Sequence, residues 1–167
     1  MQKLIELFWA IACRKSGPEV VPKSLFLAQV TGAAYLIVQI PLLLRQQVPY
    51  QSLVVSTIGD LLILCAFTWL LLRLTGKSER LMQTLTALFG VGVLISIVAI
   101  PVGFMMYALS ETDIFILPFL ALLGILIWSV LAAGHIFACA LSRAPLEGIV
   151  IALFYYVINY QLIQFLL

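Results

Sequence analysis

Charged side chains are scarce in this chain. Asp, Glu, Lys and Arg together make up only 10% of its 167 residues, whereas about 25% of the residues in a soluble domain are charged. The formal net charge is only +2, and the basic residues are spread along the chain instead of forming a stripe. These shortages exclude an ordinary soluble domain and argue against nucleic-acid binding.

Histidine and cysteine, which commonly bind metals or act as catalytic residues, are also few. The chain has one histidine and three cysteines, Cys13, Cys65 and Cys139, which are far apart in the sequence. A closed zinc site needs about four ligands, and no glycine-rich phosphate loop, HExxH motif or GxSxG elbow is present. We therefore expect a protein that is not an enzyme and that has no metal site, disulfide framework or cofactor.

Apolar residues, by contrast, make up 64% of the sequence, and the mean hydropathy is +1.19. They form continuous runs of membrane length, without the two-residue alternation of barrel strands. Short polar connections join the runs and favour antiparallel neighbours. The predicted fold class is an all-α polytopic integral membrane helix bundle with five transmembrane helices, at residues 24–44, 52–72, 81–109, 114–141 and 146–167.

The first 16 residues precede this five-helix domain of residues 17–167. Leu4, Ile5, Phe8 and Ile11 recur at helical spacing between polar residues, which is typical of a helix lying in the membrane interface. Glu6 interrupts the apolar run, and basic residues follow the run directly, so a cleaved signal peptide is a poorer interpretation. The sequence predicts a short amphipathic helix on the cytoplasmic surface.

The basic residues predict the orientation. With five spans and a cytoplasmic N-terminus, only Arg45 falls outside, and the C-terminus is outside as well. The short loops suggest the inner (cytoplasmic) membrane of a bacterium. The basic residues expected on the inside are Lys3, Arg14, Lys15, Lys23, Arg73, Lys77, Arg80 and Arg143.

Asp60 is a carboxylate inside the second predicted span. A rise of about 1.5 Å per residue places it about 12 Å into a hydrocarbon core of about 30 Å, at a height similar to Gln39, Ser96 and Asn159. An unpaired carboxylate in lipid costs several kcal/mol, so we expect an intramembrane polar cluster of Asp60, Asn159 and Gln39. Two interpretations stay open: a structural clamp, or part of an ion or proton path.

A second polar site involves His135, which lies four residues before Cys139 on one face of the fourth span. Two ligands do not make a metal site, and no second membrane-embedded histidine is available for bis-histidine haem ligation. We expect a packing histidine that is hydrogen-bonded to Gln29 at similar height. Electron transfer through a haem on His135 remains a third interpretation.

Small residues mark the third and fourth spans. Gly90, Gly92, Gly103 and Gly134 lie in apolar sequence, where glycine lets helices approach closely. We expect these glycines to form a helix-packing face, with contact to another membrane protein as the alternative.

The passages "LLLRLTGKSERLMQTLTALFGVGVLISIVAIPV" and "IWSVLAAGHIFACALSRAPLEGIVIALFYYVI", following a cytoplasmic N-terminal segment, resemble the Yip1 superfamily of small five-span membrane proteins. The resemblance covers roughly residues 24–165. It implies a non-enzymatic protein that acts as a scaffold, partner or trafficking factor. No catalytic residue is carried over from that family.

Taken together, these features predict an accessory or scaffold subunit that binds and stabilises other integral membrane proteins, or itself, in the lipid bilayer. The rival, from another functional class, is a small oligomeric transporter or channel with its ion or proton site at Asp60. A hydrated cavity reaching Asp60 would favour the transporter. A dry, hydrogen-bonded Asp60 together with an exposed Gly/Ala face in contact with another subunit would favour the scaffold.

Overall fold

The structure is a computed structural model that describes residues 2–45 and 50–166, without the side chains of residues 42–45, 50 and 113. Within these residues it contains helices and no strand, which confirms the all-α prediction. A short helix comes first, and three-residue 3₁₀ turns precede α2, α4 and α5. The helices are α1 (Gln2–Ala12), α2 (Leu25–Arg45), α3 (Tyr50–Leu74), α4 (Leu81–Ala108), α5 (Ile116–Leu141) and α6 (Pro145–Leu166).

The five long helices begin and end close to the predicted boundaries, because each follows one continuous apolar run. Four helical segments are long and apolar enough to cross a membrane: Gln51–Leu74, Ser78–Ala108, Ile116–Leu141 and Pro145–Leu166. The apolar helical segment Leu25–Pro41 within α2 is shorter. Four candidate spans are therefore established for the described residues, and the fifth span stays a prediction.

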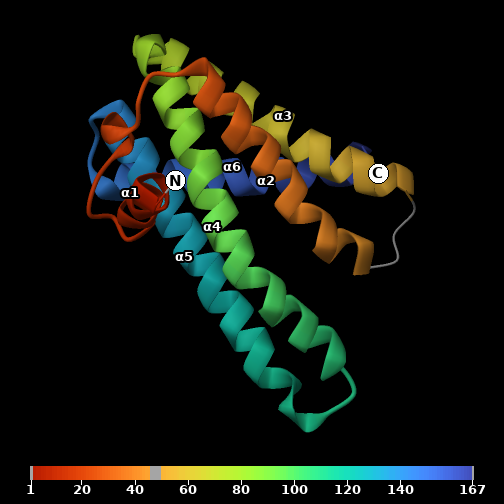
Figure 1. The fold of residues 1–167 in the computed structure, drawn as a ribbon. Coiled ribbons are helices and arrows are strands. Elements are labelled where there is room, and N and C mark those ends of the chain that lie inside the picture. Colours follow the sequence, from red (N-terminus) through yellow and green to blue (C-terminus); the bar gives the residue numbers. More distant parts are fainter. Residues whose placement is uncertain (1, 46–49, 167) are drawn as a thin grey trace.

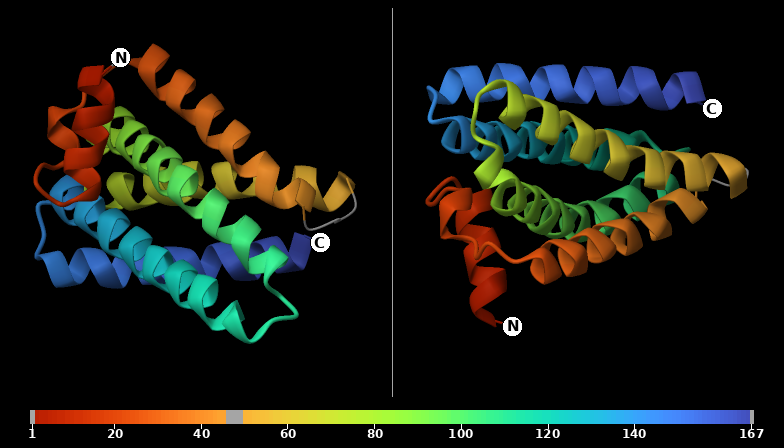
Figure 2. Two further views of the ribbon diagram at one scale, coloured as in Figure 1. Left: turned by 60° about the horizontal axis from the view of Figure 1, so that its bottom comes forward. Right: turned by 90° about the horizontal axis from the view of Figure 1, so that it is seen from above.

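Successive long helices run in opposite directions, so the chain crosses back and forth between two ends (Figure 1). One end carries α1, the α3–α4 connection and the α5–α6 connection (Figure 2). We call it the basic end, because Lys77, Arg80 and Arg143 lie in those connections. The other end, called the far end, carries the α4–α5 connection and the end of α6. The α4–α5 hairpin diverges there from α2, α3 and α6 (Figure 1).

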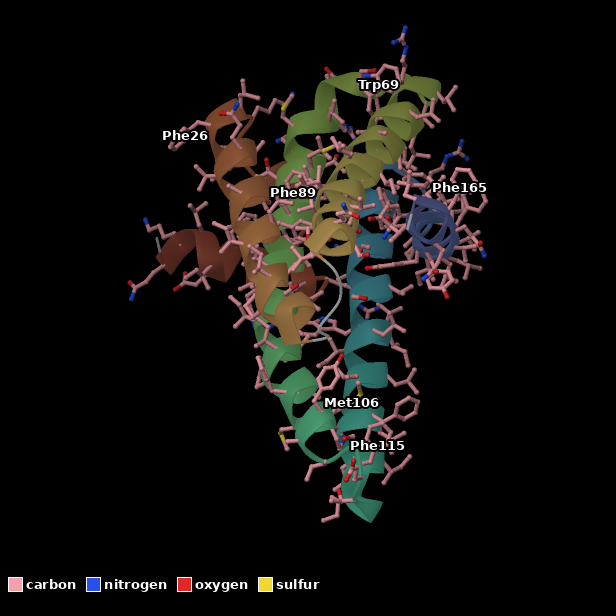
Figure 3. The ribbon with its side chains drawn as sticks, turned by 90° about the vertical axis from the view of Figure 1, so that its right-hand side faces the viewer. Phe26, Trp69, Phe89, Met106, Phe115 and Phe165 are labelled. Carbon is pink, nitrogen blue, oxygen red and sulfur yellow. The ribbon has the colours of Figure 1, made fainter. Side chains whose placement is uncertain are left out.

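The buried core is concentrated toward the basic end. Residues 84–91 of α4 are all buried, and so are most of residues 132–141 of α5. Toward the far end the same two helices expose apolar side chains, for example Met105 (53% exposed) and Leu117 (62%). Figure 3 shows this part of the hairpin, marked by Met106 and Phe115, extending beyond the other helices. Apolar side chains that face lipid do not need to be buried within the protein.

Helix α1 packs against α4 and α5 at the basic end. Phe8 and Ile11 are buried, and the Phe8 ring lies against Gly90. The indole Nε1 of Trp128 donates a hydrogen bond to the Ala12 carbonyl at 2.9 Å. The expected N-terminal helix is thus present and belongs to the core, while its position relative to a membrane surface stays a prediction.

Two basic side chains of the α3–α4 connection bind the C-terminal end of α5. Lys77 donates to the Leu141 carbonyl. The Arg80 guanidinium donates to the carbonyls of Cys139 (3.3 Å) and Ala140 (3.1 Å). Carbonyls in the last turn of a helix lack the usual i+4 donor, and cations at this terminus are favoured by the helix dipole. The Cys139 carbonyl also accepts from the backbone N–H of Ser142 at 3.1 Å. The connection is thereby tied to the end of α5.

Candidate binding site around Asp60

Asp60 lies on α3 between α2 and α6, and four side chains donate hydrogen bonds to its carboxylate. From α2, the Tyr35 hydroxyl donates to Oδ2 at 2.6 Å and the Gln39 amide donates to the same oxygen at 3.3 Å. From α6, the Asn159 amide donates to Oδ1 at 2.8 Å and the Tyr155 hydroxyl at 3.3 Å. Each carboxylate oxygen therefore accepts two bonds, and each flanking helix serves one oxygen.

The four donors match the acceptor capacity of a carboxylate. An ionised carboxylate is only an acceptor, with about four lone-pair directions on its two oxygens. Hydrogen bonds to a charged acceptor are about twice as strong as neutral ones, and they replace part of the hydration that Asp60 would lose in an apolar environment. No basic side chain forms an ion pair with Asp60 among the side chains that the structure describes.

The structure brings Gln39 and Asn159 to Asp60, as the heights along the spans predict. Sequence reasoning missed Tyr35 and Tyr155. A signal for them was present, because each tyrosine lies four residues before its amide partner, and residues at i and i+4 share one helix face. A Tyr-x-x-x-Gln pair on α2 and a Tyr-x-x-x-Asn pair on α6 thus approach Asp60 from two sides.

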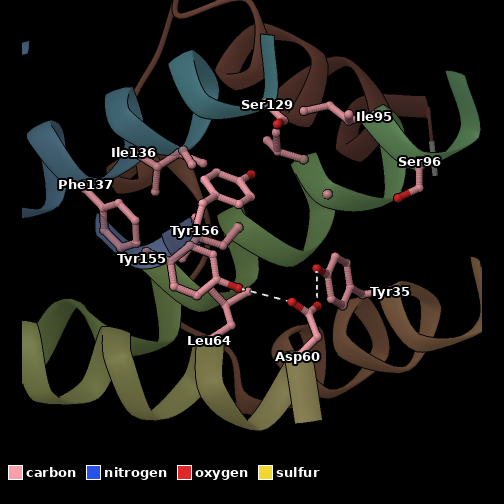
Figure 4. A pocket seen from close by; sticks show the side chains of 14 residues that line it. Tyr35, Asp60, Leu64, Ile95, Ser96, Ser129, Ile136, Phe137, Tyr155 and Tyr156 are labelled. Atoms are coloured by element: carbon pink, nitrogen blue, oxygen red, sulfur yellow. Dashed lines mark hydrogen bonds between the residues drawn. The ribbon is translucent and has the colours of Figure 1, made fainter. Parts of the chain in front are cut away.

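A pocket of about 150 Å³ adjoins Asp60 (Figure 4). It lies between α3 and the α4–α5 hairpin, with α2 and α6 contributing side chains. Part of its wall is aliphatic, from Leu64, Leu88, Val91 and Ile95. The remaining wall includes Asp60, four aromatic rings (Tyr35, Phe137, Tyr155, Tyr156) and two serines (Ser96, Ser129).

The second predicted polar pair is not formed. Gln29 is exposed on α2, and the His135 Nε2 lies 3.1 Å from the Ser16 carbonyl instead. The predicted hydrogen bond between His135 and Gln29 is therefore wrong. The connection after α1 lies against α5 and brings a backbone acceptor to the His135 ring instead. The Cys139 sulfur lies 3.7 Å from the same nitrogen. Within the described residues no group of three or more His, Cys, Asp and Glu side chains gathers around a possible metal position.

Three of the four glycines of the predicted packing face make close contacts within the chain. Gly90, Gly103 and Gly134 are buried, and Gly92 is half-buried. A Cβ at Gly90 or Gly92 would meet an aromatic ring of α1 or α2, and a Cβ at Gly134 would lie 2.8 Å from a backbone atom of α6. Gly90, Gly92 and Gly134 are therefore covered by other helices of the same chain and are not available to a partner protein.

No protein-family model, curated protein or solved structure matches this chain.

Proposed function

We propose that this chain is an integral membrane protein that crosses the cytoplasmic membrane of a bacterium five times, with its N-terminus in the cytoplasm and its C-terminus outside. The four apolar helices of membrane length support the membrane location. The gathering of Lys77, Arg80 and Arg143 at one end supports the orientation, because basic loops stay on the cytoplasmic side.

We further propose that the pocket beside Asp60 binds a small cation, as in the transporter or channel interpretation. One observation carries this proposal: the pocket of about 150 Å³ reaches a carboxylate that has hydrogen-bond donors but no basic partner among the described side chains. Ionisable groups inside membrane helices commonly mark ion or substrate paths. A cation in the pocket would balance the charge that hydrogen bonds alone leave uncompensated.

Flux measurement in proteoliposomes tests this function. We expect the purified protein to pass a small cation faster than protein-free liposomes do, with Na⁺, K⁺, H⁺ and tetramethylammonium as probes. Asp60→Asn removes the charge and should abolish the flux, whereas Glu111→Gln removes an exposed charge in the α4–α5 connection and should preserve it. Wild-type protein that is folded but indistinguishable from empty liposomes with every probe would refute the proposal.

An accessory or scaffold role is the second candidate, and the Yip1-like resemblance favours the same role. The observation in its favour is the exposed apolar surface toward the far end of α4 and α5, where Met105, Leu117, Leu120 and Leu123 are each more than two-fifths exposed. Lipid or another membrane protein can cover such a surface. The contacts of Gly90, Gly92 and Gly134 within the chain count against this role, since these three glycines are not available for close packing with a partner.

Purification in mild detergent separates the two candidates. A membrane protein that co-elutes in stoichiometric amount, and is lost when Leu117 and Leu120 are replaced by bulkier Trp, would support the accessory role. The matched control places Trp at Leu153 and Val157, which are exposed on α6. An absorbance spectrum of the same fraction tests electron transfer through His135, because haem would be visible. A colourless homo-oligomer would leave the cation site as the better candidate.

A further inference from the structure

We infer that the pocket beside Asp60 selects an organic cation with a fully alkylated nitrogen, such as a quaternary ammonium group, over metal ions and primary amines. This inference names the ligand class for the proposed cation site and therefore rests on that proposal. It depends on three properties of the pocket: the occupied acceptors of Asp60, the aromatic wall and the size.

The first property concerns the acceptors. Both oxygens of Asp60 already accept two hydrogen bonds each, at distances from 2.6 to 3.3 Å. A primary ammonium must place three N–H donors, and a metal ion needs several oxygen ligands. To bind the Asp60 carboxylate directly, either ligand would have to displace a tyrosine or an amide from it. A quaternary ammonium has no N–H donor, so the negative charge of Asp60 can attract it while the four hydrogen bonds to the carboxylate stay in place.

The second property is the aromatic wall. Tyr35, Phe137, Tyr155 and Tyr156 all line the pocket, and Figure 4 shows Tyr35 and Tyr155 reaching Asp60 from different sides. The rings of Tyr155 and Tyr156 are 5.2 Å apart and inclined by 59°, so they form two differently oriented surfaces. Aromatic rings attract cations through their quadrupole, and the attraction is strongest where water is excluded. Grouped rings of this kind are a recurrent device for binding quaternary ammonium.

The third property is the size and polarity of the remaining space. A volume of about 150 Å³ equals that of an apolar protein cavity known to bind benzene, which has six heavy atoms. Tetramethylammonium, with five heavy atoms, fits within the same volume. Beside the hydroxyls of Ser96 and Ser129, the wall includes the aliphatic side chains of Leu64, Leu88 and Val91, which suit methyl groups better than they suit a hydrated metal ion.

Equilibrium binding of radiolabelled tetramethylammonium to the purified full-length protein in nanodiscs tests the inference. We expect saturable binding that unlabelled tetramethylammonium displaces at lower concentration than methylammonium, Na⁺ or K⁺. Tert-butanol, a neutral molecule of similar bulk, should not compete. This order of ligands is measured on the unaltered chain, so it does not depend on whether any variant folds.

Variants then locate the site. Asp60→Asn and Tyr156→Leu should each weaken binding by about tenfold or more, because they remove the charge and one ring. Tyr156→Phe keeps the ring and should weaken binding less than Tyr156→Leu does. The matched controls, Glu111→Gln and Tyr160→Leu, alter exposed residues outside the pocket and should leave the affinity unchanged.

The outcomes separate this inference from the proposed function. Asp60-dependent flux of Na⁺, K⁺ or H⁺ without saturable tetramethylammonium binding would overturn the inference and leave the cation site standing. Methylammonium binding as tightly as tetramethylammonium, or a Tyr156→Leu variant that is folded and binds normally, would also overturn it. The absence of both flux and binding would refute the inference and the proposed function together.

Discussion

The hydroxyl of Tyr35 on α2 donates a hydrogen bond of 2.6 Å to the carboxylate of Asp60 on α3. The same tyrosine ring packs on Phe89 of α4 at a centroid distance of 5.7 Å and lines the pocket. One side chain thus joins three helices and forms part of the binding wall. The contact therefore serves both the stability of the bundle and the geometry of the candidate site.

Tyr35→Phe keeps the ring and its packing but removes the hydroxyl donor. We expect a loss of about 1 kcal/mol in unfolding free energy, since hydrogen bonds between membrane helices contribute about 0.6 kcal/mol on average and up to about 1.7. Reversible unfolding in mixed micelles measures the change. Tyr160→Phe, on an exposed tyrosine of α6, is the matched control and should leave stability unaltered. Equal stability of both variants would show that the Tyr35 hydrogen bond is not important for the fold.

Gly134→Ala should destabilise the contact between α5 and α6. The added Cβ would lie 2.8 Å from the Ile149 Cα and 3.0 Å from its backbone nitrogen, so the helices themselves must move apart. Overpacking of this kind costs about 1–3 kcal/mol. Gly124→Ala, on the same helix, adds the same methyl group where nothing lies within 4 Å. Thermal unfolding of the two variants in detergent should therefore differ, and a Gly134→Ala protein as stable as Gly124→Ala would contradict the described packing.

Arg80→Gln should cost more stability than Arg143→Gln, although both remove one positive charge. Arg80 binds two carbonyls at the end of α5 and the Ser142 hydroxyl, whereas Arg143 forms an exposed ion pair with Glu147 at 3.5 Å. We expect a loss of about 1–2 kcal/mol for Arg80 and less than about 0.5 kcal/mol for Arg143. Chemical unfolding measured side by side gives the comparison. The reverse order would mean that the α3–α4 connection does not stabilise the end of α5.

The orientation predicts which connections a membrane-impermeant maleimide reaches in intact cells. In a background with Cys13, Cys65 and Cys139 replaced by alanine, Ser110→Cys in the α4–α5 connection should react from outside. Ala144→Cys in the α5–α6 connection should react only after the membrane is permeabilised. Both positions are exposed in the structure. Labelling in the opposite pattern would show that the proposed orientation is wrong. Labelling of both cysteines from the same side would contradict the proposal that α5 crosses the membrane.

Much of the fold could be predicted from the sequence because it depends on local properties. Continuous apolar runs predict the helices and their ends, and helical rise places Asp60 at the height of Gln39 and Asn159. Their hydrogen bonds to Asp60 agree with that estimate. The helical spacing of Leu4, Ile5, Phe8 and Ile11 likewise predicts the helix α1. Phe8 and Ile11 are buried in the core, whereas Ile5 is 56% exposed.

Other features depend on how each helix is rotated about its axis and how the connections pack, and the sequence does not carry this information locally. In the sequence, Tyr35 and Tyr155 do not differ from other aromatic residues of apolar helices. They contact Asp60 because of how α2 and α6 are rotated about their axes. His135 lies against the Ser16 carbonyl because the connection after α1 packs on α5, a contact between residues far apart in the sequence. Hydropathy and helical rise determine the length and depth of a helix, whereas its rotation is decided only by the packing of all the helices together.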